Sequence, residues 1–155
     1  MKKLLFLILG VSSLFAAQPE PPKFLMVEPL RAISVKAGKS VETSILVKIN
    51  PEFHIQANPA SRPNLIPTTI DFPEKDGMVL EGVTYPDGKA FRLENSDQDL
   101  MVYGGETKFK VKIHAKNAKP GKVEFKGLLK YQPCNNQTCF FPNRYSLVLP
   151  IQVVK

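Results

Sequence analysis

Residues 106–113, Glu-Thr-Lys-Phe-Lys-Val-Lys-Ile, alternate between charged side chains and side chains that are apolar or β-branched. Successive side chains of a β-strand point to opposite faces of the sheet, so a period of two gives one buried and one solvated face. The segment therefore predicts a half-buried strand.

The same period of two recurs along most of the chain. It is clearest in residues 41–49, 123–131 and 145–153, and shorter candidates are residues 31–35, 68–72 and 78–84. Clusters of Gly, Pro, Asn and Asp separate these segments, as turns do. We find no convincing helical period after the first residues. The pattern predicts an all-β fold, an immunoglobulin-like antiparallel β-sandwich of about seven or more strands.

The beginning of the chain predicts export. A positively charged start, an apolar run and two small residues predict a cleavable secretory signal over residues 1–17. The apolar run is too short to span a bilayer, so we expect no stable membrane insertion. Residues 18–29 are rich in proline and predict a loosely held arm, and residues 30–155 form one domain.

The net charge is +7, and +5 without the signal, where 19 Lys and Arg face 14 Asp and Glu. The lysines largely alternate with apolar residues along the predicted strands, which is typical of a solvated sheet face. We therefore expect no nucleic-acid partner.

Residues 89–103 form the longest stretch without clear alternation and predict a long loop. A loop of this length on a compact sandwich is either functional or an ordinary solvated connection.

Cys134 and Cys139 are the only cysteines, within residues 131–142, Tyr-Gln-Pro-Cys-Asn-Asn-Gln-Thr-Cys-Phe-Phe-Pro. In an oxidising compartment such a pair is a structural disulfide, a dithiol that cycles, or a soft metal site. The flanking strands place the pair near the base of a loop between antiparallel neighbours, with Cα atoms about 4.5 to 5.5 Å apart. A disulfide can form at that separation.

The short loop gives the bond a modest structural value. Closing a loop of roughly six residues contributes about 2 kcal/mol in the chain-entropy model, well below the gain from a distant pairing. This favours a bond that opens, although a structural bridge in an interaction module and a metal site both stay open as interpretations. Tyr131, Phe140 and Phe141 either shelter the sulfurs or belong to the core.

A metal site could include a methionine as a ligand beside the two cysteines. Two thiolates with Met78 or Met101 would suit Cu(I), as in a copper chaperone. The histidines, His54 and His114, fit structural or solvent-facing roles, and no spacing is typical of zinc or calcium sites. We therefore expect no cofactor and no bound metal in the redox interpretation.

The cysteine hairpin resembles the active-site hairpin of the N-terminal periplasmic domain of the thiol:disulfide interchange protein DsbD, in the form shared with disulfide bond corrector domains. Three further segments are similar to that family in the same order: residues 53–59, Phe-His-Ile-Gln-Ala-Asn-Pro; residues 65–68, Leu-Ile-Pro-Thr; and residues 102–106, Val-Tyr-Gly-Gly-Glu. Phe141 departs from the family, since many relatives have the first of two prolines there.

The resemblance implies a periplasmic thiol-disulfide exchange protein of the protein-disulfide reductase type. Its dithiol would take electrons from a membrane-linked thiol reductase of the DsbD or CcdA kind, or from a thioredoxin-like domain. Oxidised periplasmic proteins would receive them, and we expect the carrier to be a monomer. In such domains the second cysteine exchanges and the first resolves, which here means Cys139 and Cys134. Phe91 is the candidate for an aromatic ring over the sulfurs.

Overall fold

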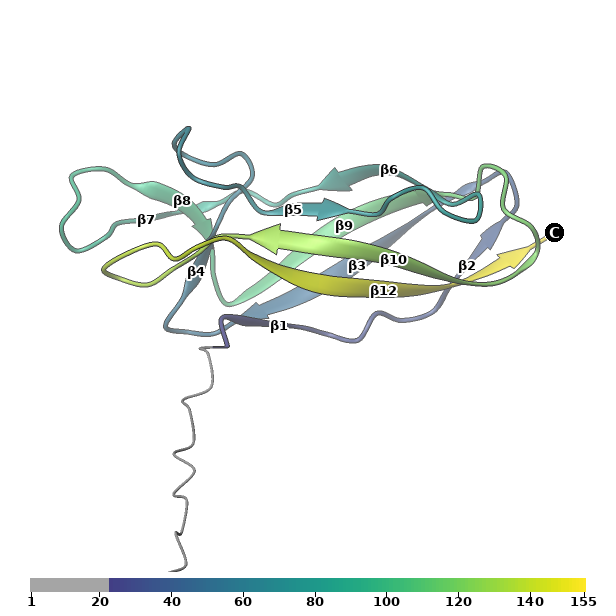
Figure 1. Ribbon diagram of the computed structural model, residues 1–155, viewed down its shortest axis with the longest axis horizontal. Helices are drawn as coiled ribbons and strands as arrows, with labels where there is room; N and C mark the ends of the chain where they lie inside the picture. Colours follow the sequence, from purple (N-terminus) through teal and green to yellow (C-terminus); the bar gives the residue numbers. More distant parts are fainter. Residues whose placement is uncertain (1–22) are drawn as a thin grey trace, which may run out of the picture.

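The segments that alternate in sequence form strands in the computed structural model of the chain, which describes residues 23–155. Two four-stranded sheets run along the molecule, and a third sheet of short strands lies at one end (Figure 1). The described residues contain no helix. The fold is an all-β, immunoglobulin-like sandwich, so the predicted fold class is confirmed.

The first sheet has the strand order β1-β3-β9-β6, and all its pairings are antiparallel. Its strands are β1 (Leu25–Val27), β3 (Ser40–Ile49), β9 (Glu106–His114) and β6 (Val79–Thr84).

The second sheet has the order β2-β12-β10-β5, in which only the pairing of β2 with β12 is parallel. Its strands are β2 (Ile33–Lys36), β12 (Asn143–Val154), β10 (Gly121–Tyr131) and β5 (Thr69–Asp71).

The third sheet has the order β11-β4-β8-β7 and is antiparallel throughout. Its strands are β11 (Pro133–Cys134), β4 (His54–Gln56), β8 (Leu100–Tyr103) and β7 (Lys89–Phe91). Strands β4 and β11 are too short to show a period, and the sequence did not predict them.

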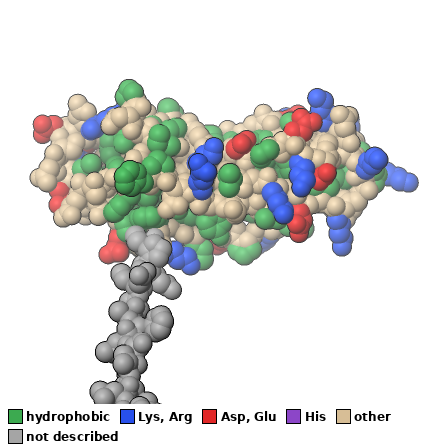
Figure 2. Space-filling model, in the orientation of Figure 1, with side chains coloured by type: hydrophobic (Ala, Val, Ile, Leu, Met, Phe, Trp, Pro, Cys, Tyr) green, Lys and Arg blue, Asp and Glu red, His purple; other side chains and the backbone are tan. Residues whose placement is uncertain are grey.

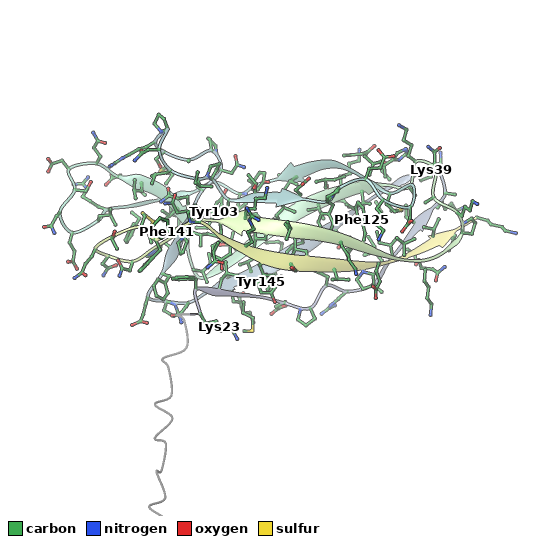
Figure 3. The ribbon with its side chains drawn as sticks, in the orientation of Figure 1. Lys23, Lys39, Tyr103, Phe125, Phe141 and Tyr145 are labelled. Atoms are coloured by element: carbon green, nitrogen blue, oxygen red, sulfur yellow. A yellow bond between two sulfur atoms is a disulfide. The ribbon has the colours of Figure 1, made fainter. Side chains whose placement is uncertain are left out.

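The core lies between the first two sheets and consists of alternate residues of their strands. Phe109, Val111 and Ile113 of β9 are fully buried, whereas the lysines between them are exposed. In the facing sheet, the ring of Phe125 stacks on that of Phe72 with centroids 5.0 Å apart, midway along the sandwich (Figure 3). The half-buried strand predicted from residues 106–113 is confirmed.

The predicted arm over residues 18–29 differs from the structure where it is described. Leu25 and Val27 are buried and pair with Ile49 and Val47 of β3, so this part of the arm is a strand of the first sheet. This strand has only three residues, which are too few to show an alternation in the sequence. The pairing is stabilised because it removes two apolar side chains from water. The predicted signal peptide, residues 1–17, lies outside the described residues.

The prediction of one long loop over residues 89–103 is wrong at both ends. Strands β7 and β8 form a hairpin whose tip is residues 92–99, which we call the cap hairpin. The sequence of strand β8 shows no alternation because Leu100, Val102 and Tyr103 are all buried, on both faces of the strand.

Membrane-spanning helices are also absent from the part of the chain that the structure describes. No helix within residues 23–155 has the length and hydropathy needed to cross a bilayer.

Gly127 of β10 tests how closely Asp71, the last residue of β5, and the following Phe72 approach strand β10. A Cβ atom at this position would lie 2.5 Å from the carbonyl oxygen of Asp71 and 2.6 Å from the ring of Phe72. We expect Gly127→Ala to lower the free energy of unfolding by about 1–3 kcal/mol, because a packed interior does not accept the added methyl group. Urea denaturation measures this change.

Gly82 is the matched control, since it is also a strand glycine but has no atom within 4 Å of its ideal Cβ position. Gly82→Ala should leave the stability unchanged or raise it by up to about 1 kcal/mol. Equal stabilities of the two alanine variants would contradict the packing described for Gly127.

Candidate functional site

Cys134 and Cys139 form a disulfide at the end of the β10–β12 hairpin, with an S–S distance of 2.02 Å. Their Cα atoms are 3.9 Å apart, closer than the 4.5 to 5.5 Å expected from a regular ladder. The two residues form an isolated antiparallel bridge beyond the paired part of β10 and β12, where the ladder spacing no longer applies.

The loop between the cysteines is held by its own hydrogen bonds. The side-chain oxygen of Asn135 accepts the backbone N–H groups of Gln137 and Thr138, at 2.9 and 2.8 Å. The N–H of Asn135 donates to the carbonyl of Thr138, and that of Phe140 to Pro133. The cysteines therefore sit at the base of an ordered turn.

The third sheet places Cys134 beside β4. In the pairing of β11 with β4, Cys134 lies opposite His54, and Pro133 lies opposite Ile55. Directly opposed residues of an antiparallel pair have their side chains on the same face. Cys134, His54 and Gln56 therefore share one face of this sheet, while Ile55 enters the core.

Gln56 contacts both sulfurs. Its fully buried carboxamide lies with Nε2 3.1 Å from Sγ of Cys134 and 3.6 Å from Sγ of Cys139, and donates to both. Sequence reasoning missed this residue. The available signal was a polar side chain between two apolar residues, Ile55 and Ala57.

The backbone of Gln56 is fixed from both sides. Its N–H donates a hydrogen bond to the carbonyl of Gln132, at 3.1 Å, and its carbonyl accepts one from the hydroxyl of Thr68, at 2.6 Å. Thr68 is itself buried, and it ends the segment that leads into β5. The position of the carboxamide relative to the disulfide is therefore set by β4 and its neighbours.

The two cysteines differ in access. Cys134 has no exposed surface, whereas Cys139 is half-buried. Thiol-disulfide exchange needs an approach to one sulfur, so the arrangement makes Cys139 the accessible end of the bond.

The ring of Phe91, in β7, stacks on the imidazole of His54, with centroids 4.1 Å apart and planes 27° from parallel. Gly104 leaves room for this imidazole, because a Cβ atom there would lie 3.0 Å from His54 Cδ2. Phe91, whose ring was predicted to lie over the sulfurs, thus contacts His54, the cross-strand neighbour of Cys134.

The aromatic residues near the cysteines have different surroundings. Tyr131 is buried in the core, and Phe140 packs against Phe24 and Phe53, with centroids 5.4 and 6.0 Å apart. Phe141 is 92% exposed and lies at the cysteine end of the molecule (Figure 3). The expectation that Phe141 shelters the sulfurs or joins the core is therefore wrong.

The cap hairpin touches the cysteine loop. The N–H of Glu94 donates to the carbonyl of Asn136, at 2.8 Å, and Arg92 pairs with Asp99 across the hairpin, at 2.7 Å. An open, largely polar pocket lies beside this contact. Its lining residues are Pro51, Glu52, Phe53, Glu94, Asn135, Asn136 and Gln137.

The methionines named as copper ligands do not lie with the cysteines. Met78 is fully buried in the core, next to Gly77, which contacts the β9–β10 turn at the opposite end of the sandwich (Figure 1). Met101 follows Leu100 in β8, and the register puts its side chain on the face opposite that of Val102 and Gln56. The described residues contain no cluster of three or more His, Cys, Asp or Glu suited to a metal ion.

Charge and hydrophobicity are unevenly distributed over the surface. On the face shown in Figure 2, hydrophobic side chains gather toward the cysteine end, whereas most Lys and Arg lie over the middle and the opposite end. The cysteine end is therefore the less basic part of this face.

Comparisons with known proteins bear on this arrangement. The family model described as "Thiol:disulfide interchange protein DsbD, N-terminal" matches residues 21–150. No curated protein sequence gives a significant match.

Two solved structures are similar in fold. The N-terminal domain of Neisseria meningitidis DsbD in the reduced form is 15% identical, with 68% of this chain and 74% of that chain covered and a TM-score of 0.46. The N-terminal periplasmic domain of ScsB from Proteus mirabilis is 15% identical, with 75% of this chain covered and a TM-score of 0.50. The chain spans 42% of the ScsB structure.

His54 should make the stability depend on pH. Burial lowers the pKa of its imidazole from the ordinary value of 6.5. His54 then binds a proton more readily in the unfolded chain than in the folded one. The free energy of unfolding therefore has its full value above about pH 6.5 and falls as the pH drops below it. Urea denaturation at pH 7.5 and pH 5.5 measures the loss, and we expect a smaller loss for His54→Phe. An equal loss in both proteins would show that His54 is not its source.

Proposed function

Because the chain belongs to the family of N-terminal domains of the thiol:disulfide interchange protein DsbD, we propose that it relays electrons between thiol proteins in the periplasm. Family membership makes the chain a thiol-disulfide exchange domain, whose redox partners are thiol proteins. The proposal adds the direction of electron flow and the roles of the two cysteines. Residues 1–17 serve in it as the export signal.

The observation that carries the proposal is the unequal burial of the two cysteines. A disulfide between a half-buried cysteine, Cys139, and a fully buried one, Cys134, is open to attack at Cys139, while Cys134 stays within the protein. A partner that reaches the hairpin therefore meets Cys139 first. This supports Cys139 as the exchanging cysteine and Cys134 as the resolving one.

The reaction transfers two electrons through one mixed disulfide. In the reduced protein, the Cys139 thiolate attacks a sulfur of an oxidised periplasmic protein, and the other sulfur of that protein leaves as a thiolate. The Cys134 thiolate then attacks Cys139, forms the Cys134–Cys139 bond and releases the second sulfur of the partner. The released thiolates take protons from solvent according to their pKa values.

The reverse sequence reloads the carrier. A thiolate of a membrane-linked reductase, or of a thioredoxin-like domain, attacks Cys139 and displaces Cys134. A second thiol of the donor resolves the mixed disulfide, which leaves both cysteines reduced and the donor oxidised.

We assign the cap hairpin a shielding role in this cycle. Phe91 holds the hairpin against His54, and Glu94 ties its tip to the cysteine loop through Asn136. The stacking and the single backbone hydrogen bond are contacts that a partner can displace when it approaches Cys139. Phe140 and Tyr131 contribute by fixing the base of the cysteine hairpin.

Trapping tests the assignment. With Cys134→Ser produced in the periplasm, Cys139 should accumulate partners as mixed disulfides, because the resolving thiol is missing. Non-reducing electrophoresis followed by reduction and mass spectrometry identifies these adducts.

Cys139→Ser is the matched control and should capture several-fold less, since Cys134 is buried. The opposite outcome, with adducts on the Cys139→Ser protein alone, would reverse the assigned roles. Capture by neither variant would contradict the relay.

A further inference from the structure

The resolving cysteine faces a desolvation problem. Cys134 has no exposed surface, and when the disulfide opens by attack on Cys139, the Cys134 sulfur leaves as a thiolate. Burial in apolar surroundings disfavours a thiolate and raises the pKa of the thiol. A poor leaving group slows exchange, so the site needs a group that stabilises negative charge on this sulfur.

The Gln56 carboxamide is placed to do so. Its Nε2 lies 3.1 Å from Sγ of Cys134, the shorter of its two sulfur contacts. A disulfide sulfur carries no hydrogen and can only accept, so the amide must present its nitrogen to the bond. A hydrogen bond to an ionised acceptor is roughly twice as strong as one to a neutral acceptor, so this contact strengthens when the thiolate forms.

The other end of the same carboxamide points to a role beyond packing. Oε1 of Gln56 is buried and has no hydrogen-bond partner among the described residues. An unpaired buried polar atom lowers stability, and an apolar side chain of the same shape would avoid that loss. The carboxamide is thus a poor choice for stability alone, whereas its donor is directed at the sulfurs.

We propose that Gln56 is a catalytic residue of the exchange reaction, whose carboxamide N–H stabilises the Cys134 thiolate each time the disulfide opens. This rests on the proposed function, because it requires a bond that opens. When a partner thiolate bonds to Cys139, the Cys134–Cys139 bond breaks and its electron pair stays on Cys134, facing Gln56. In the reverse step that electron pair forms the bond to Cys139 again, and the partner sulfur leaves.

The first test measures the Cys134 thiol alone. In a Cys139→Ser background, the ultraviolet absorbance of the thiolate is followed against pH, with Gln56 present or replaced by methionine. Methionine has a similar length and no donor. We expect the pKa of the Cys134 thiol to rise by about one unit in Gln56→Met.

Two further variants separate charge stabilisation from general loosening. Gln56→Glu keeps the side-chain length but replaces the donor by a carboxylate, so it should raise the Cys134 pKa at least as far as Gln56→Met. Gln132→Met removes a neighbouring carboxamide that bonds Phe140 and Ile66 and not the sulfurs, and should leave that pKa unchanged. Equal shifts in Gln132→Met and Gln56→Met would overturn the proposal.

The second test uses the protein with both cysteines. Its equilibrium with a glutathione series should shift several-fold toward the disulfide in Gln56→Met at pH 9.5, and by at most about tenfold at a pH above the Cys134 pKa of both proteins. The two proteins should converge at pH 6, where the Cys134 thiol is protonated. Identical equilibria at pH 9.5 would overturn the role of Gln56 alone. A wild-type disulfide that no glutathione mixture opens would overturn the proposed function, whatever the Cys134 titration shows.

Discussion

The antiparallel ladder between β10 and β12 is the constraint on which the rest of the structure depends. It runs without a shift from Gly121 opposite Val153 to Tyr131 opposite Asn143, and its buried residues line one side of the core. Because the strands are continuous with the cysteine hairpin, the register that buries the core also fixes where the two sulfurs lie. Stability and the redox site therefore share one element.

The short third sheet brings side chains of β4 to the cysteines, which the β10–β12 ladder does not do. Strand β4 pairs with β11 on one side and β8 on the other, so its side chains alternate between the core and the cysteines. Ile55 belongs to the core, while His54 and Gln56 lie on the face of Cys134. The chain thereby brings a buried donor to the disulfide from a segment 78 residues earlier in the sequence.

Much of the sandwich was predictable from sequence because half-buried strands carry their own period, as residues 106–113 do. The elements that were missed either are too short for a period, like β1, β4 and β11, or are buried on both faces, like β8. The cysteine pair was evident from composition, but its surroundings depend on long-range pairing. Phe141, in an apolar stretch, is exposed, and Gln56, a polar residue, is fully buried, so neither environment follows from residue type.

The redox state of the Cys134–Cys139 pair in cells tests the central claim most directly. Rapid acid quenching, alkylation of free thiols and mass analysis give the fractions of dithiol and disulfide. We predict that both forms are populated and that the dithiol fraction falls when the membrane-linked reductase is removed. A pair that is fully disulfide-bonded under both conditions, in cells where the protein is functioning, would contradict the account.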